Sequence, residues 1–175
     1  MPGFLTSPLI AQTKHVDVKV TGMYYNEVWK TTKPYPVTVY TDLEAKAYVR
    51  LDGPNVAAGF VTADDLDALI AALEKSLTWS TKAKEAGLEA TKDLASFMTP
   101  YDGAEQGLSL TFAASDAGEI SLVLLEVADF DNRFKRTTFA LTPDQVGQLI
   151  TALKALPDAF HALKKGTSKA DEILQ

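Results

Sequence analysis

The chain has 175 residues, of which 46% are hydrophobic, and it contains no cysteine. A chain of this length buries roughly 70% of its unfolded surface, so a hydrophobic core can stabilise it without disulfides or a structural metal. The absence of cysteine excludes a disulfide framework, a thiolate nucleophile and a cysteine-based zinc site. Seventeen basic and 23 acidic residues give a formal net charge of −6, which argues against wholesale attraction to phosphate backbones but allows a local basic strip.

Residues 1–14 are expected to form an N-terminal arm, either frayed or docked on a partner subunit. Pro2 and Pro8 interrupt its short apolar stretch and no basic segment precedes it, so we do not expect a signal peptide. No run approaches the ~18 apolar residues of a membrane span. We therefore expect a cytoplasmic protein without membrane contact.

Residues 15–87 are predicted to form a first unit, an antiparallel meander followed by a helix. Val16, Val18 and Val20 alternate with polar residues, which is the period of a strand with one buried face. Further strand-like runs cover residues 24–31, 37–41, 45–51 and 55–61, with a predicted break at residues 33–36 (Lys-Pro-Tyr-Pro) and a predicted turn at residues 52–54 (Asp-Gly-Pro).

The first helix is predicted to begin after Thr62, where the period changes from 2 to 3.6. Its apolar stripe consists of Leu66, Leu69, Ile70, Leu73 and Leu77. We expect the Thr62 hydroxyl to accept a hydrogen bond from the N–H of Asp65 or its neighbour, and Asp64 and Asp65 to interact with the helix dipole. Gly87 is expected to mark the helix end.

Residues 88–163 are predicted to form a second unit of the same kind. Residues 91–99 suit either a helix or a strand, and residues 100–107 are expected to be a loop. Strands are predicted from residue 108, over 120–127 and over 134–141, with a hairpin turn at 115–118. Because residues 120–127 are almost wholly apolar, we expect this strand to be covered on both faces.

The second helix is predicted to begin at a capping box. Thr142 is the N-cap, Pro143 occupies N1, and the Gln145 side chain can reach back to the cap. Pro157 is expected to break or kink this helix. Residues 164–175 are expected to be a polar tail.

The two helix starts are part of an internal repeat with an offset of 80 residues. Residues 62–73 and 142–153 are identical at six of twelve positions, although any two capped amphipathic helices share some residues. We interpret the repeat as a tandem duplication. The predicted fold is α+β with two tandem antiparallel-sheet-plus-helix units, and we expect residues 120–127 to lie near their junction or at a subunit interface.

Residue types that carry catalysis or bind metals are sparse. His15 and His161 are the two histidines, and neither belongs to a metal-binding motif. Residues 129–132 resemble the opening of a calcium loop, but the glycine and glutamate that such a loop requires are missing. We expect no enzymatic activity, no cofactor and no metal.

A binding surface is predicted on the face of the first sheet that points away from its helix. Period 2 places Thr38, Tyr40, Tyr48 and Arg50 on this face, with aromatic residues on the strand before them and basic residues elsewhere to add charge. The candidate binding residues are Tyr24, Trp29, Tyr40, Tyr48, Arg50, Arg133, Lys135 and Arg136. Tyr, Trp and Arg are common at protein interfaces, so we expect a non-catalytic binding protein that acts through this face and self-associates, with another protein or a second copy as partner.

The order of several strands and then a helix, present twice, is similar to the arrangement of the single-stranded DNA-binding proteins of the Whirly-like and positive-cofactor-4-like families. The resemblance covers the order of elements and no sequence motif. It implies single-stranded nucleic-acid binding on the aromatic sheet face as the alternative function.

Overall fold

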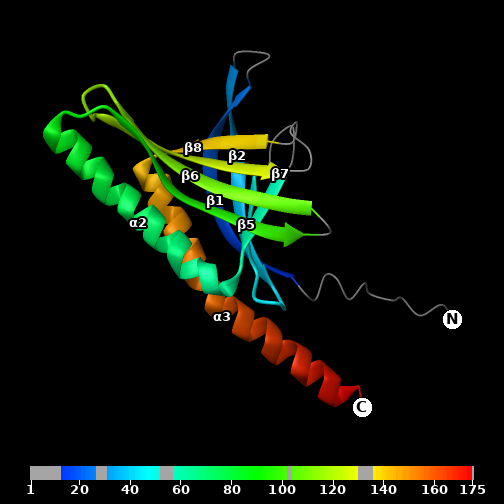
Figure 1. Cartoon of the computed structure of the whole chain (residues 1–175). Helices are drawn as coiled ribbons and strands as arrows, with labels where there is room; N and C mark the ends of the chain where they lie inside the picture. The colour runs from blue at the N-terminus through cyan, green and yellow to red at the C-terminus, as the bar shows by residue number, and fades with distance from the viewer. Residues whose placement is uncertain (1–12, 27–30, 52–56, 102–103, 130–135, 175) are drawn as a thin grey trace.

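The computed structural model describes residues 13–26, 31–51, 57–101, 104–129 and 136–174. It is an α+β protein in which four strands and a helix occur twice in succession (Figure 1). The first half contains β1 (Thr13–Asn26), β2 (Thr31–Asp42), β3 (Ala47–Leu51), β4 (Ala57–Val61) and α2 (Ala63–Ala86). The second half contains β5 (Ala90–Tyr101), β6 (Ala104–Ser115), β7 (Ile120–Asp129), β8 (Arg136–Leu141) and α3 (Pro143–Ile173).

Each half is an antiparallel four-stranded meander, and the two meanders join edge to edge. The strand order is β4-β3-β2-β1-β8-β7-β6-β5, and the β1–β8 junction is short, with Met23 paired to Ala140 and Tyr24 to Phe139. The meanders also approach each other face to face, because a Cβ added to Gly59 of β4 would lie 3.2 Å from Val127 Cγ2 and 3.3 Å from Leu108 Cβ. A single cluster of buried residues draws from both halves.

The helices cross over between the halves, in the sense that each helix packs mainly on the strands of the other half. Helix α2 follows the first meander but makes most of its sheet contacts with β5, β6 and β7, whereas α3 follows the second meander and packs mainly on β1 and β2. The two helices also contact each other. Each meander therefore depends on the helix of the other half for its apolar cover.

Both helix starts lie where they were predicted. Thr142 forms the predicted capping box, in which Gln145 N donates to Thr142 Oγ1 and Thr142 N donates to Gln145 Oε1. Thr62 has the same extended conformation, but its hydroxyl donates to Asp65 Oδ2 at 3.2 Å, so the predicted acceptor role is wrong. Gly87 ends α2 as predicted, in the left-handed conformation with φ of 60°.

Several strands are longer than predicted. Strand β1 joins the runs at residues 16–20 and 24–26, and β2 continues through the predicted break at residues 33–36. Proline is tolerated there because this part of β2 pairs with β1 alone, so a missing N–H can face the unpaired side. Residues 91–99 belong to β5, and the predicted loop at 100–107 is wrong, because β6 begins at Ala104 and pairs with β5.

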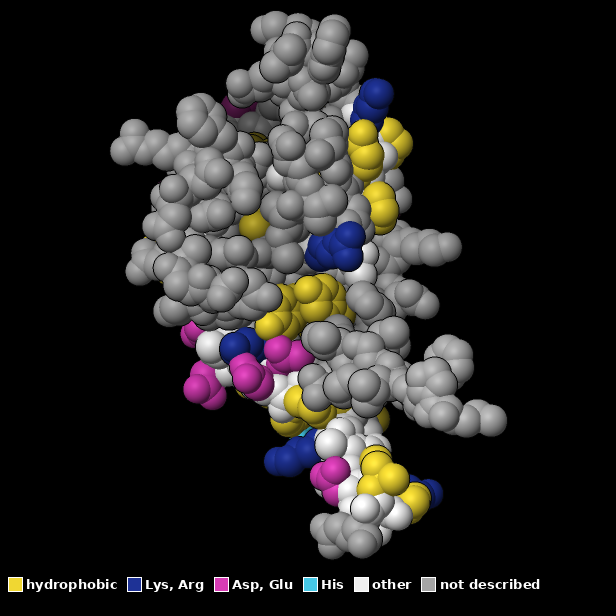
Figure 2. All heavy atoms as spheres, turned by 90° about the vertical axis from the view of Figure 1, so that its right-hand side faces the viewer, with side chains coloured by type: hydrophobic (Ala, Val, Ile, Leu, Met, Phe, Trp, Pro, Cys, Tyr) yellow, Lys and Arg dark blue, Asp and Glu magenta, His cyan; other side chains and the backbone are white. Residues whose placement is uncertain are grey.

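Of the break or kink expected at Pro157, the break is not found, because α3 continues to Ile173 and includes most of the predicted polar tail. Pro157 is exposed, whereas Leu153, whose carbonyl lacks its helical N–H partner, is completely buried. The last turns of α3 extend away from the rest of the protein (Figures 1 and 2).

Strand β7 is covered on one face by the described residues. Val123, Leu125 and Val127 are buried, whereas Leu122 and Leu124 are half-buried and Ile120 is 51% exposed. The expectation of cover on both faces is therefore not met by the described part of the chain.

The predicted turn at 52–54, residues 130–132 of the segment that resembles a calcium loop, and residues 1–12 of the arm lie outside the described residues. Among the helices that are described, none is long and apolar enough to span a membrane.

Candidate binding surface on the first meander

One face of β2 and β3 points away from the core. Along β2, Val37 and Val39 are completely buried while Thr38 and Tyr40 are half-buried, and along β3 the half-buried Arg50 lies between Val49 and Leu51. The register pairs Tyr40 with Tyr48 and Thr38 with Arg50. The structure thus brings these four predicted residues together, and we call Thr38, Tyr40, Tyr48 and Arg50 the outer face.

The two tyrosines of the outer face form a cross-strand stack. Their ring centroids lie 4.7 Å apart and the ring planes differ by 2°. Tyr48 is 9% exposed, and its hydroxyl donates to Asp42 Oδ2 at 2.9 Å. Aromatic pairs of this kind stabilise antiparallel strands. Tyr48 is therefore a fixed support for the more exposed Tyr40.

Asp42 holds the turn next to this stack. Its Oδ1 accepts hydrogen bonds from the backbone N–H groups of Glu44 and Lys46, at 2.9 and 3.1 Å. The turn contains Ala45 with φ of 58°, and Lys46 forms a 2.5 Å ion pair with Glu44. The neighbourhood of the outer face consequently carries both signs of charge.

Asp42 was not among the residues predicted for the site. The signal that could have found it is its position just before a turn, where an Asp side chain commonly accepts hydrogen bonds from backbone N–H groups a few residues later. The hydrogen bond from Tyr48, six residues away, depends on the hairpin register.

The remaining candidate residues are not brought to the outer face by the described structure. Tyr24 pairs with Phe139 at the β1–β8 junction, whereas the β1 residue opposite Tyr40 is His15. Arg136 pairs with Ala128 in the second meander. Trp29, Arg133 and Lys135 lie outside the described residues.

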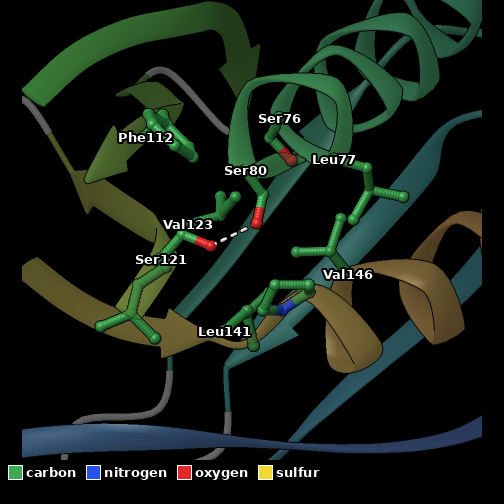
Figure 3. A pocket seen from close by; sticks show the side chains of 10 residues that line it. Ser76, Leu77, Ser80, Phe112, Ser121, Val123, Leu141 and Val146 are labelled. Atoms are coloured by element: carbon green, nitrogen blue, oxygen red, sulfur yellow. Dashed lines mark hydrogen bonds between the residues drawn. The ribbon is translucent and has the colours of Figure 1, made fainter. Parts of the chain in front are cut away.

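A small cavity lies between α2, β7 and the start of α3 (Figure 3). Ser80 and Ser121 point toward each other in it and form a hydrogen bond, with Phe112, Leu141 and Val146 among the apolar lining residues. Its volume of about 10 Å³ accommodates roughly one water molecule. This cavity is too small for an organic substrate.

Within the described ranges, no group of three or more histidine, aspartate or glutamate side chains is placed to hold a metal ion.

No protein-family model matches the chain, and no curated protein matches its sequence. What the protein does is therefore inferred from its own residues.

Proposed function

We propose that this chain is a non-catalytic binding protein that acts through the outer face. The observation that supports the proposal is the half-exposed Tyr40 ring, stacked on a buried Tyr48 that Asp42 holds by its hydroxyl. A ring held in this way loses little conformational freedom when a partner packs against it. Arg50, across from Thr38 on the same face, adds a cation with several hydrogen-bond donors.

A protein is the proposed partner. Tyrosine and arginine are the residue types that contribute most to protein–protein binding energy. The mixed charges of Asp42, Glu44, Lys46 and Arg50 suit a protein surface better than a uniformly negative polymer, and the net charge of −6 agrees with this choice. A second copy of the chain is one such protein, and a cytoplasmic location remains our expectation.

Tyr40→Ala is expected to weaken binding of a protein partner by about 30-fold, the effect of losing a hot-spot tyrosine, and Arg50→Ala by about tenfold. The measurement is affinity purification from the native host with quantitative mass spectrometry, followed by titration with the purified partner. Lys82→Ala is the control for Arg50→Ala, because it removes the same charge from an exposed position on α2. A partner set that is equal for all four proteins would contradict the proposal.

Single-stranded nucleic acid is the second candidate ligand. The observation that favours it is the order of four strands and a helix, present twice, which is the arrangement of the families named above. Fold alone does not carry function, but a half-exposed tyrosine beside an arginine is also suited to stacking a base and contacting a phosphate.

If this second candidate is correct, a labelled oligothymidylate will bind at low salt, and log Kd will rise linearly with log salt concentration. Tyr40→Ala is expected to cost about 1–3 kcal/mol of binding free energy, and Arg50→Ala to reduce the salt slope by about 1. Lys82→Ala should leave the affinity and the slope close to those of the unmodified chain. Absence of binding at low salt would remove nucleic acid as a ligand.

We also propose that the two halves arose by tandem duplication. The helices begin at Ala63 and Pro143, and the threonines before them have the same backbone conformation, with φ of −71° in both. The test is a superposition of the halves without regard to sequence. It should place Thr62 on Thr142, and any other alignment of the helix starts would contradict common descent of the halves.

A further inference from the structure

The apolar pattern of α3 continues beyond the part of the helix that packs on the core. Hydrophobic or small residues recur at alternating spacings of three and four along α3 and up to its C-cap residue, Leu174: Val146, Leu149, Leu153, Leu156, Phe160, Leu163, Thr167, Ala170 and Leu174. The residues up to Leu156 are buried in the core, Phe160 and Leu163 are half-buried, and those from Thr167 onward are exposed. Such spacing is typical of a helix that packs against another helix along one seam.

We call residues 163–174, which include most of the predicted polar tail, the tail. Every residue from 164 to 174 is exposed, and Ile173 and Leu174, at 72% and 84%, are the most exposed large hydrophobic residues of the described chain. Figure 2 shows hydrophobic side chains near the end of this projecting helix. Gly166, Thr167 and Ser168 have low helix propensity, so this part of α3 needs packing contacts to be a stable helix.

The distribution of charges along the tail indicates which partner it can bind. Lys164 and Lys165 lie at one end, and Asp171 and Glu172 follow seven residues later, two turns along the same side of the helix. Lys164 and Asp171 flank the apolar seam, so in an antiparallel pair Lys164 of each copy faces Asp171 of the other, whereas Lys165 and Glu172 lie on the opposite side of the helix. A parallel pair would instead leave Lys164 and Asp171 without a charged residue across the seam.

We propose that the tail pairs antiparallel with the tail of a second copy of this chain. The twofold axis passes between Ser168 and Lys169, so that Leu163 lies opposite Leu174 of the second copy and Thr167 opposite its Ala170. Gly166 lies beside the seam near this axis and has no side chain to hold the second helix away. The inference goes beyond the proposed function, because it places self-association on a surface separate from the outer face.

Sedimentation equilibrium over a range of concentrations tests the pairing. The mass of the full chain should rise from 18.9 kDa toward twice that value. Lys164→Glu is expected to weaken the dimer by about tenfold, because two attractive contacts between Lys164 and Asp171 become repulsive. Adding Asp171→Lys should restore dimerisation, since it restores both the net charge and the complementarity.

A chain that stays monomeric at all concentrations overturns the proposal, and so does a Lys164→Glu variant that dimerises as tightly as the unmodified chain. The substituted residues are exposed, so an unchanged thermal unfolding midpoint of the dilute monomer verifies folding. Tyr40→Ala should leave the dimer intact, whereas the tail variants should leave binding of an outer-face ligand intact. A failure of either proposal is thus distinguishable from a failure of the other.

The absence of cysteine allows a direct test of orientation. A mixture of Thr167→Cys and Ala170→Cys chains should form a mixed disulfide dimer, because these positions share a layer. Leu174→Cys alone should not form a disulfide dimer, since its two copies would lie roughly 16 Å apart along the helix axis, beyond the ~7 Å Cα separation that a disulfide tolerates. Efficient disulfide formation by Leu174→Cys alone would overturn the antiparallel arrangement.

Discussion

Gly118→Ala is expected to lower the free energy of unfolding by about 3 kcal/mol or more. Gly118 lies in the hairpin turn between β6 and β7 with φ of 83°, a conformation that alanine adopts only with strain. An added Cβ would also lie 2.2 Å from the carbonyl oxygen of Ala83 and 2.7 Å from the nitrogen of Lys84. Both atoms belong to the backbone of α2, so neither can move aside by a rotamer change.

Urea denaturation followed by circular dichroism measures this loss. Gly147→Ala is the matched control, because a Cβ there meets nothing within 4 Å and the residue lies inside α3. Removing a glycine from a helix interior should raise the free energy of unfolding by about 0.5–1 kcal/mol. Equal effects of the two substitutions would show that the 115–118 turn does not pack against α2 as described.

Phe139→Ala is expected to lower the free energy of unfolding by about 3–5 kcal/mol. Phe139 is completely buried, and it pairs with Leu125 of β7 and with Tyr24 of β1, so it lies where the two meanders join. Its removal leaves a cavity that both halves border, and the surrounding side chains can fill it only in part.

Thermal and urea unfolding, followed by fluorescence and by circular dichroism, measure this loss. They also show whether the core unfolds as one cooperative unit. Because the helices cross over, both probes should report one transition that shifts as a whole. Phe97→Ala serves as the control, since this ring is half-buried at the edge of the same core and should cost less. Two separate transitions in the Phe139→Ala protein would contradict a shared core.

Structural features that depend on residues only a few positions apart could be predicted from the sequence. The turn at 115–118 is present, with Gly118 N donating to Ser115 O and positive φ at Asp116 and Ala117. Alternation along 37–41 and 47–51 was enough to place Tyr40, Tyr48 and Arg50 on one face, because side chains of a strand point to alternate sides. The two-residue period of the strands was therefore enough to predict the central residues of the outer face.

The prolines show the limit of local rules. Pro34 and Pro36 were interpreted as a break between strands, yet β2 continues through them, and α3 continues through Pro157, where a break or a kink was expected. Proline disrupts a strand only where its missing N–H is needed for pairing. That depends on which side of the strand is paired, and this is not encoded in neighbouring residues.

The strands-then-helix unit was determined by the sequence itself, since the capping box at Thr142 and the two changes of period from 2 to 3.6 depend on contacts within a few residues. The tertiary structure alone decided that each helix covers the meander of the other half, that Tyr48 is buried against Asp42 and that the tail of α3 extends into solvent. The physical reason is that an apolar stripe specifies that a face must be buried but not which surface buries it. That choice depends on the path of the chain and on the shape of distant residues.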